Sequence, residues 1–214
     1  MLLLSSSLVY INSESVNEAV SSTVETRNTD ESPLVGLAEE EFWPVLRVSF
    51  PAKPFPNSQL GHLFEGDNSA QQYISEISGG DSQLTTTIVG DTWASPYAES
   101  HWGTDSDTER DTGADSGGVR ELAREAIIST FSGPNWDQNL DISQWDLDGD
   151  FIIDRLLILH SGQPQEEGGP STSIWSHFSY FYEPVKVGEY TFEHYTMASV
   201  HGGLGVLVLS LIHI

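Results

Sequence analysis

The chain has 214 residues, enough for one sizeable hydrophobic core or a core with a flexible leader, and too few for three domains. Its 32 acidic residues against 8 lysines and arginines give a formal charge of −24, which argues against nucleic acid and anionic membranes as partners. Since the sequence contains no cysteine, disulfides, thiolate metal sites and cysteine nucleophiles are excluded.

Residues 1–41 have the character of a leader. The opening MLLLSSSLVYI is apolar but has no basic residue before it, so it fits either the remnant of a secretory signal or a poorly ordered terminus. From Asn12 to about Glu41 small polar and acidic residues predominate, and such a composition buries too little apolar surface to order itself. We expect a disordered, propeptide-like leader and a secreted protein.

The character of the sequence changes at Pro44. Val45–Phe50 has the composition of a strand and leads into the proline-rich loop PAKPFP. Asn68 and Ser69 can cap a helix that ends at Gly79. The apolar face of this predicted helix consists of Ala70, Tyr73, Ile74 and Ile77. The β-branched stretch QLTTTIVG that follows predicts a second strand.

The second half of the chain alternates further helices and strands. Ala94–Gly118 predicts a long acidic loop, and Val119–Phe131 has the apolar spacing of an amphipathic helix. Ile152–Leu159 is almost continuously apolar, which favours a central strand over the rival interpretation, a short helix. The aromatic stretches SIWSHFSYF and VGEYTFEHYTMAS add β structure. The sequence therefore predicts a mixed α/β or α+β domain.

The acidic stretch WDLDGDFIID contains four carboxylates close together: Asp146, Asp148, Asp150 and Asp154. In the twelve-residue EF-hand pattern these would be calcium-loop positions one, three, five and nine. Position six carries Phe151 instead of glycine, and position twelve carries Leu157 instead of glutamate. Two interpretations stand: a calcium loop completed from elsewhere in the fold, or an Asp-rich turn whose side chains satisfy backbone groups.

Seven histidines are scattered along the chain: His62, His101, His160, His177, His194, His201 and His213. No two of them have the i, i+4 spacing that places two imidazoles on one helix face. The sequence also lacks a G-x-S-x-G elbow, a phosphate-binding glycine loop and a basic aromatic patch. The residues alone therefore predict a secreted, acidic α/β domain with a candidate calcium loop and no catalytic site.

Several stretches together resemble the immune inhibitor A family of secreted bacterial zinc metallopeptidases. From about Val45 to Val208 they are, in order, VLRVSFPAKPFP, DNSAQQYISEISGG, QWDLDGDFIIDRLLILHSG, SIWSHFS and VGEYTFEHYTMASVHGGLGVLV. The resemblance implies a zincin-like domain, in which a mixed, twisted sheet is backed by helices and an edge strand pairs with an extended peptide substrate. It also implies that His160 to Gly162 and the loop Ile174 to His177 line the substrate cleft.

Family members continue from HGGLGVLV into a helix that carries H-E-x-x-H, whose histidines bind zinc and whose glutamate activates water. Here Val208 is followed by LSLIHI, which contains one histidine, His213, and no glutamate. On this resemblance we expect 42–208 to be the N-terminal part of a metallopeptidase catalytic domain. The chain would be truncated at the start of the active-site helix, with 209–214 as a non-native tail.

The leading hypothesis is a fragment of a secreted zinc-dependent endopeptidase that hydrolyses protein or peptide substrates with metal-activated water. Its zinc ligands and catalytic residues would lie outside this chain, and the four aspartates would hold calcium. The alternative is a non-catalytic, calcium-stabilised extracellular binding module. The apolar stretch from Gly203 is about twelve residues long, short of the roughly 20 that a spanning helix needs, so we expect no membrane span.

Overall fold

A mixed β-sheet organises the residues that the computed structural model describes, which are 35–57, 60–114, 117–133 and 139–202. The strand order is β2-β1-β4-β6-β5, and the short β3 pairs with the end of β1. The strands are β1 (Glu40–Ser49), β2 (Gln83–Ile88), β3 (Trp93–Ala94), β4 (Leu157–His160), β5 (His177–Val187) and β6 (Tyr190–Ser199). All neighbouring pairs are parallel except β5 with β6, so the expected mixed sheet is confirmed.

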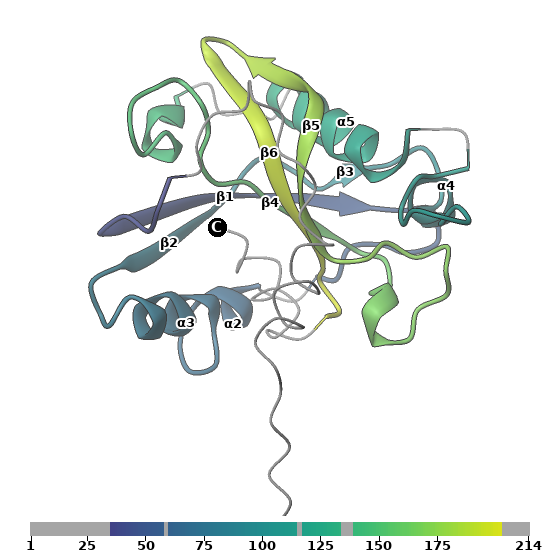
Figure 1. Cartoon of the computed structure of the whole chain (residues 1–214), viewed down its shortest axis with the longest axis horizontal. Coiled ribbons are helices and arrows are strands. Elements are labelled where there is room, and N and C mark those ends of the chain that lie inside the picture. The colour runs from purple at the N-terminus through teal and green to yellow at the C-terminus, as the bar shows by residue number, and fades with distance from the viewer. Residues whose placement is uncertain (1–34, 58–59, 115–116, 134–138, 203–214) are drawn as a thin grey trace, which may run out of the picture. The chain divides into compact units, whose positions relative to one another are not determined.

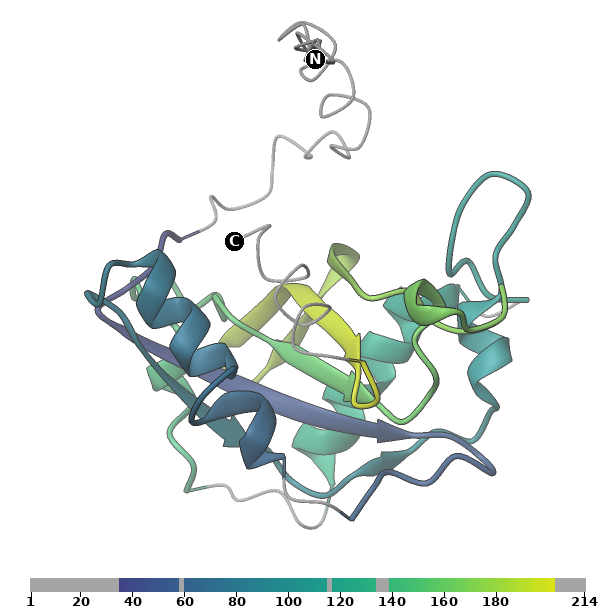
Figure 2. The ribbon, with the colours of Figure 1, turned by 90° about the horizontal axis from the view of Figure 1, so that it is seen from below.

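Helices cover both faces of this sheet, as Figures 1 and 2 show. The long helix α5 (Gly118–Ser132) packs on one face, and α2 (Gly61–Phe64) and α3 (Ala70–Ile77) pack on the other. A hydrophobic core lies on each face of the sheet, and β1 contributes side chains to both. Trp43 and Val45 pack on the α3 side, and Leu46 and Val48 pack on the α5 side. Burial on both faces explains the apolar runs Phe42–Leu46 in β1 and Leu157–Leu159 in β4.

Several predicted elements are confirmed close to their expected bounds. Helix α3 begins at Ala70, and its N-cap Ser69 accepts a hydrogen bond of 3.2 Å from the backbone N–H of Gln72. Helix α5 and strand β2 also lie where the apolar spacing and the β-branched run predict them. Strands β5 and β6 form a hairpin that turns at Gly188, whose φ of 63° is in the left-handed region.

Other elements differ from the prediction. Strand β1 begins at Glu40, inside the predicted leader, and Glu41 is fully buried. The predicted strand Ile152–Leu159 is shorter, because regular pairing starts only at Leu157 and Ile152 makes one isolated bridge to Thr191. The predicted long loop from Ala94 contains a helix, α4 (Glu99–Gly103). At the start of β1 and in α4, a buried glutamate, Glu41 or Glu99, lies in backbone that composition alone assigns to leader or loop.

A buried ion pair joins the start of β1 to Arg155, the residue after the aspartate-rich loop Asp146–Asp154, which is called the acidic loop from here on. The Nε and Nη2 atoms of Arg155 donate to Glu41 at 2.8 and 3.0 Å, and both side chains are almost fully buried. Trp43 Nε1 and the N–H of Ala38 also donate to the Glu41 carboxylate, at 2.7 and 2.8 Å. With these partners the charges are compensated, which buried charges require.

The described helices include none that is both long and apolar enough to cross a bilayer. Residues 1–34 and 203–214 lie outside the described residues. Most of the predicted leader, the predicted tail 209–214 and His213 therefore stay predictions.

Candidate functional site

The acidic loop lies between a short 3-10 helix, η1 (Ile142–Trp145), and β4. The carboxylate of Asp146 organises it, because Oδ1 accepts from the N–H groups of Gly149 and Asp150 at 2.8 and 3.1 Å, and Oδ2 accepts from Phe151 at 3.0 Å. The first carboxylate of the pattern thus fixes the path of the next five residues. This arrangement satisfies backbone groups, as the turn interpretation expects, and it also curls the loop.

Phe151, at position six of the calcium-loop pattern, has a φ of 68°. The EF-hand pattern places glycine there for a sharp turn, and the loop keeps such a conformation although its residue is phenylalanine. The ring is half-exposed and lies 5.9 Å from the ring of Tyr190, centroid to centroid. The departure from glycine therefore strains this residue without straightening the loop.

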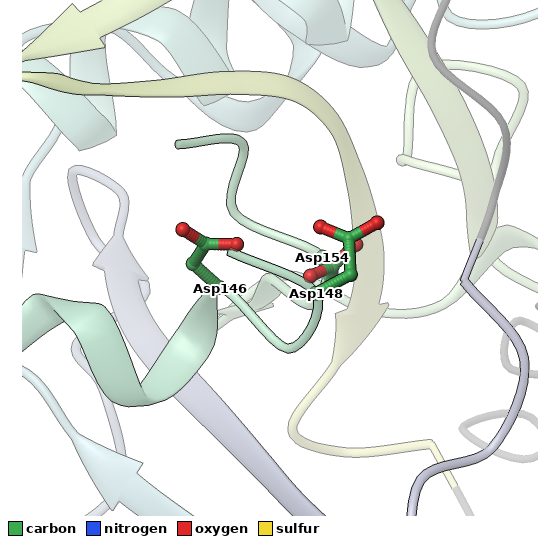
Figure 3. Close-up of side chains that lie close together, drawn as sticks. All are labelled: Asp146, Asp148 and Asp154. Atoms are coloured by element: carbon green, nitrogen blue, oxygen red, sulfur yellow. The ribbon is translucent and has the colours of Figure 1, made fainter. Parts of the chain in front are cut away.

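Three of the four predicted aspartates converge. Asp146, Asp148 and Asp154 each offer a carboxylate oxygen, and these oxygens lie within 4.8 Å of one another (Figure 3). Asp150 lies in the same loop but outside this group, and its Oδ1 accepts from the N–H of Ile152 at 2.8 Å. Leu157, at position twelve, is buried in the core within β4, so Asp154 is the carboxylate that closes the group from the C-terminal side.

Asp154 is the carboxylate of this group whose pKa is raised. Burial raises the pKa of Asp154 to about 6, and the charges of Asp148 and Asp150 add to this effect. A hydrogen bond from the N–H of Leu147, at 2.6 Å, and the Arg155 charge act in the opposite direction on the pKa of Asp154. Burial and the charges of Asp148 and Asp146 likewise raise the pKa of Asp150. A divalent cation between these oxygens would remove the repulsion.

Among the described residues this is the one group of three or more histidine, aspartate or glutamate side chains whose ligand atoms come together. All of its ligand atoms are carboxylate oxygens. Hard oxygen ligands suit calcium or magnesium, whereas a catalytic zinc site draws on histidine nitrogens. The ligand set of this group therefore fits a hard cation and does not fit zinc.

A second polar cluster lies where the parallel strands β1 and β4 end. Glu99 of α4 is almost fully buried; its carboxylate pairs with Lys53 Nζ at 2.5 Å and accepts from the N–H of Ile174 at 3.2 Å. Gly162 packs against the same carboxylate, since a Cβ there would lie 2.0 Å from Glu99 Oε1. The segments His160–Gly162 and Ile174–His177, which the resemblance assigns to the substrate cleft, thus meet around Glu99.

His160 completes this cluster. Its Nδ1 accepts from the N–H of Gly162 at 3.1 Å and lies 3.9 Å from Glu99 Oε1. Complete burial, followed by the charges of His177, Lys53 and His201, lowers the pKa of His160 to about 3, so the ring is neutral at physiological pH. Sequence reasoning missed Glu99, because a glutamate inside an acidic stretch carries no signal that it is buried.

Two comparisons with known proteins bear on this site. A family model described as the immune inhibitor A peptidase M6 catalytic domain matches residues 55–209. The curated protein immune inhibitor A of Bacillus thuringiensis subsp. alesti is 32% identical to this chain over an alignment of 119 residues, which covers 50% of this chain and 17% of that protein. The family-model match includes the acidic loop and, in the second cluster, Glu99, His160 and Gly162, whereas Lys53 precedes it.

The strain at Phe151 gives a stability prediction. Phe151→Gly and Phe151→Ala both lose the ring contact with Tyr190, but only the glycine variant relieves the left-handed conformation. We expect Phe151→Gly to be more stable than Phe151→Ala by about 1 kcal/mol in urea unfolding. Equal stability of the two variants, or a more stable alanine variant, would show that this conformation carries no strain.

The raised pKa of Asp154 predicts a pH dependence. Because the Asp154 carboxyl group binds its proton more tightly in the folded state, the folded protein loses stability as the pH rises. The loss occurs between the unfolded-state pKa near 4 and the folded-state pKa of about 6. In a chelating buffer the wild-type protein should lose about 2 kcal/mol more than Asp154→Asn over this window. Urea unfolding at several pH values measures this difference between the two proteins, and parallel profiles of stability against pH would contradict the prediction.

Proposed function

The chain belongs to the immune inhibitor A peptidase family, a family of metallopeptidases, and on that premise we propose that it forms the N-terminal part of the catalytic domain of a secreted zinc endopeptidase. The whole protein would hydrolyse peptide bonds in protein substrates with metal-activated water. The observation that carries this proposal is that the family's catalytic-domain model covers most of the described sheet and its helices. The aligned residues span 17% of the curated relative, so activity is proposed for the whole protein.

We propose that the zinc ligands of the whole protein lie outside the described residues. The sequence of this chain contains no H-E-x-x-H, and the described residues bring no set of histidines together as ligands. We therefore assign no catalytic step to residues of this chain. Its proposed contributions are the sheet that receives the substrate and the loop that holds a structural cation.

The edge strand β5 is the proposed substrate-binding element. Between His177 and Tyr180 it pairs with β6 on one side, and within the described residues no strand pairs with its other side. An extended peptide can add to such an edge through backbone hydrogen bonds. Arg120 Nε of α5 donates to the carbonyl of Tyr180 at 3.1 Å, and this contact marks the end of the proposed stretch. The Glu99 cluster lies beside the start of this stretch, through Ile174.

We also propose that the acidic loop binds calcium through Asp146, Asp148 and Asp154, with Asp150 close enough to contribute its charge. The convergence of three oxygens and the curled backbone around Asp146 support this proposal. A secreted protein meets enough calcium to fill a site of modest affinity. Bound only by the folded state, calcium would stabilise the fold by about 2.7 kcal/mol at a concentration 100 times the Kd.

The calcium proposal is tested by thermal unfolding in millimolar calcium and in chelator. We expect calcium to raise the Tm of the wild-type protein, and Asp148→Ala to lose most of this rise. Asp107→Ala, at an exposed acidic position far from the loop in sequence, is the matched control and should keep it. Terbium luminescence excited through Trp145, the residue before Asp146, gives an independent readout. Equal Tm values with and without calcium would reject the site.

The peptidase proposal is tested on the genomic sequence beyond the codon of Val208. We expect an in-frame H-E-x-x-H there, and chelator-sensitive casein cleavage by the protein that the whole frame encodes. Replacing the glutamate of that motif by glutamine should remove cleavage and leave zinc bound. The 214-residue chain is the matched control and should not cleave casein. A frame without the motif would favour the calcium-stabilised binding module, and zinc-dependent cleavage by the 214-residue chain would show that its own histidines hold the metal.

A further inference from the structure

The loop Asp105–Asp111, which follows α4, packs against the segment Gln165–His177, which leads from β4 into β5. Partly exposed contacts join the two: the N–H of Asp105 donates to the carbonyl of Ser171 at 3.0 Å, Gln165 Nε2 donates to Asp105 Oδ2 at 2.8 Å, and the Arg110 guanidinium carbon lies 3.5 Å from the centroid of the Trp175 ring. These contacts form an interface between two parts of the chain that are far apart in sequence.

Asp111 is the buried member of this interface. The residue is 7% exposed, and both of its carboxylate oxygens accept from the N–H of Trp175, each at 3.2 Å. The N–H of Asp111 donates to Asp105 Oδ1 at 3.0 Å, and its carbonyl accepts from the N–H of Val119 at 3.1 Å. Its φ of 54° is left-handed, a conformation that aspartate and asparagine tolerate better than most residues. The loop thus closes onto the segment through a carboxyl group that is withdrawn from water.

The surroundings of Asp111 disfavour its ionised form. The ionisable side chains that face it come from its own loop, from the 3-10 helix η2 (Gln165–Glu167) and from the start of β5: Asp105, Arg110, Glu166 and His177. Burial is the largest cause that raises the pKa of Asp111, to about 8. The hydrogen bond from Trp175 lowers this pKa, the charges of two neighbouring carboxylates raise it, and the Arg110 charge lowers it. His177 Nδ1 lies 3.9 Å from Asp111 Oδ2 and donates to the carbonyl of Trp175 at 2.6 Å.

Charged side chains of the two neighbouring helices bind other partners. Glu99 of α4 pairs with Lys53, and Arg120 of α5 binds the Ser179 hydroxyl and the carbonyl of Tyr180 in β5. Glu99 also accepts from the N–H of Ile174. The segment Gln165–His177 is therefore held from a second side, and the loop is the part of the interface that can move away.

We propose that the loop Asp105–Asp111 is a pH-controlled clamp on the segment Gln165–His177, closed most firmly when the Asp111 carboxyl group is neutral. In the open loop water hydrates this group, and its pKa returns to the ordinary value near 4. The closed clamp therefore has its full stability below about pH 4 and loses it as the pH rises to about 8, by roughly a factor of ten in the closing equilibrium per pH unit. The other contacts set how stable the closed clamp is, and Asp111 sets its dependence on pH.

The clamp lies beside the proposed peptide-binding edge. Trp175, whose N–H binds Asp111, is two residues before His177, where β5 begins. Opening of the clamp frees this N–H and would loosen the entry to the peptide-binding stretch. This consequence rests on the proposed function, whereas the clamp itself is tested without a substrate.

Hydrogen exchange of the full chain in chelating buffer, followed by NMR, tests the clamp. After correction for the intrinsic exchange rate, the opening constants of the amides of Asp105, Asp111 and Trp175 should rise about tenfold per unit between about pH 5 and pH 7. Asp111→Asn is the matched variant, because its amide resembles the neutral acid and tolerates the left-handed conformation. Its opening constants should change at most about threefold over the whole range. Equal pH dependence in the two proteins would overturn the clamp.

Carbon-13 NMR of the carboxyl groups identifies the residue that titrates. In the folded wild-type protein the Asp111 carboxyl group should titrate with a midpoint of about 8. Glu166→Gln removes one of the facing charges, keeps an acceptor for the N–H of Ser176, and should lower this midpoint. Glu183→Gln, at an exposed position of β5, is the matched control and should leave the midpoint unchanged. A midpoint near the ordinary value of about 4 would overturn the clamp. If Asp111→Asn does not fold, this titration decides.

Discussion

The buried pair of Arg155 and Glu41 is the interaction on which the arrangement of this sheet depends. It lies where β1 enters the sheet and where the chain leaves the acidic loop for β4, two neighbouring parallel strands more than a hundred residues apart in sequence. Isolated charges at these positions would be strongly unfavourable, and the pair is acceptable because further hydrogen bonds satisfy both side chains. The guanidinium binds three backbone carbonyls, and the carboxylate binds an indole and a backbone amide. The pair therefore specifies which strand start meets which loop end.

Because β1 and β4 are parallel, the two polar groups of the domain lie at opposite ends of the sheet. The acidic loop precedes β4, and the Glu99 cluster follows it at His160. In open α/β sheets, ligands bind beyond the carboxyl ends of the strands, where polar side chains from several loops can meet. The Glu99 cluster has that position and draws on α4, the end of β4 and the segment before β5. The acidic loop, at the other end, is suited to a structural cation that holds β4 to the β5–β6 hairpin, which it contacts through Thr191.

How far the sequence predicts this structure depends on how local the determining contact is. Helix α5 and the Ser69 cap of α3 arise from apolar spacing and from a hydrogen bond between residues three apart, so both are predictable. The start of β1 at Glu40 is not, because the partner that allows Glu41 to be buried, Arg155, lies far along the chain. The same limit applies to Glu99, which is buried because Lys53, His160 and the N–H of Ile174 converge on it. A residue pattern records spacing along the chain, and these contacts have no fixed spacing.

The acidic loop shows the same distinction within one motif. Its four aspartates can be recognised by spacing, and the structure brings three of them together. The EF-hand pattern is a less reliable guide to the details, because it assigns ligand roles by position within a single helix–loop–helix unit. Here the chain enters a buried strand after Asp154, so position twelve falls in the core and position five turns to the backbone of Ile152. Glycine is expected at position six because the backbone there is left-handed, and Phe151 adopts this left-handed conformation at a cost in strain. Carboxylate oxygens can thus converge where the residue pattern is incomplete, because the backbone hydrogen bonds to the first aspartate curl the loop.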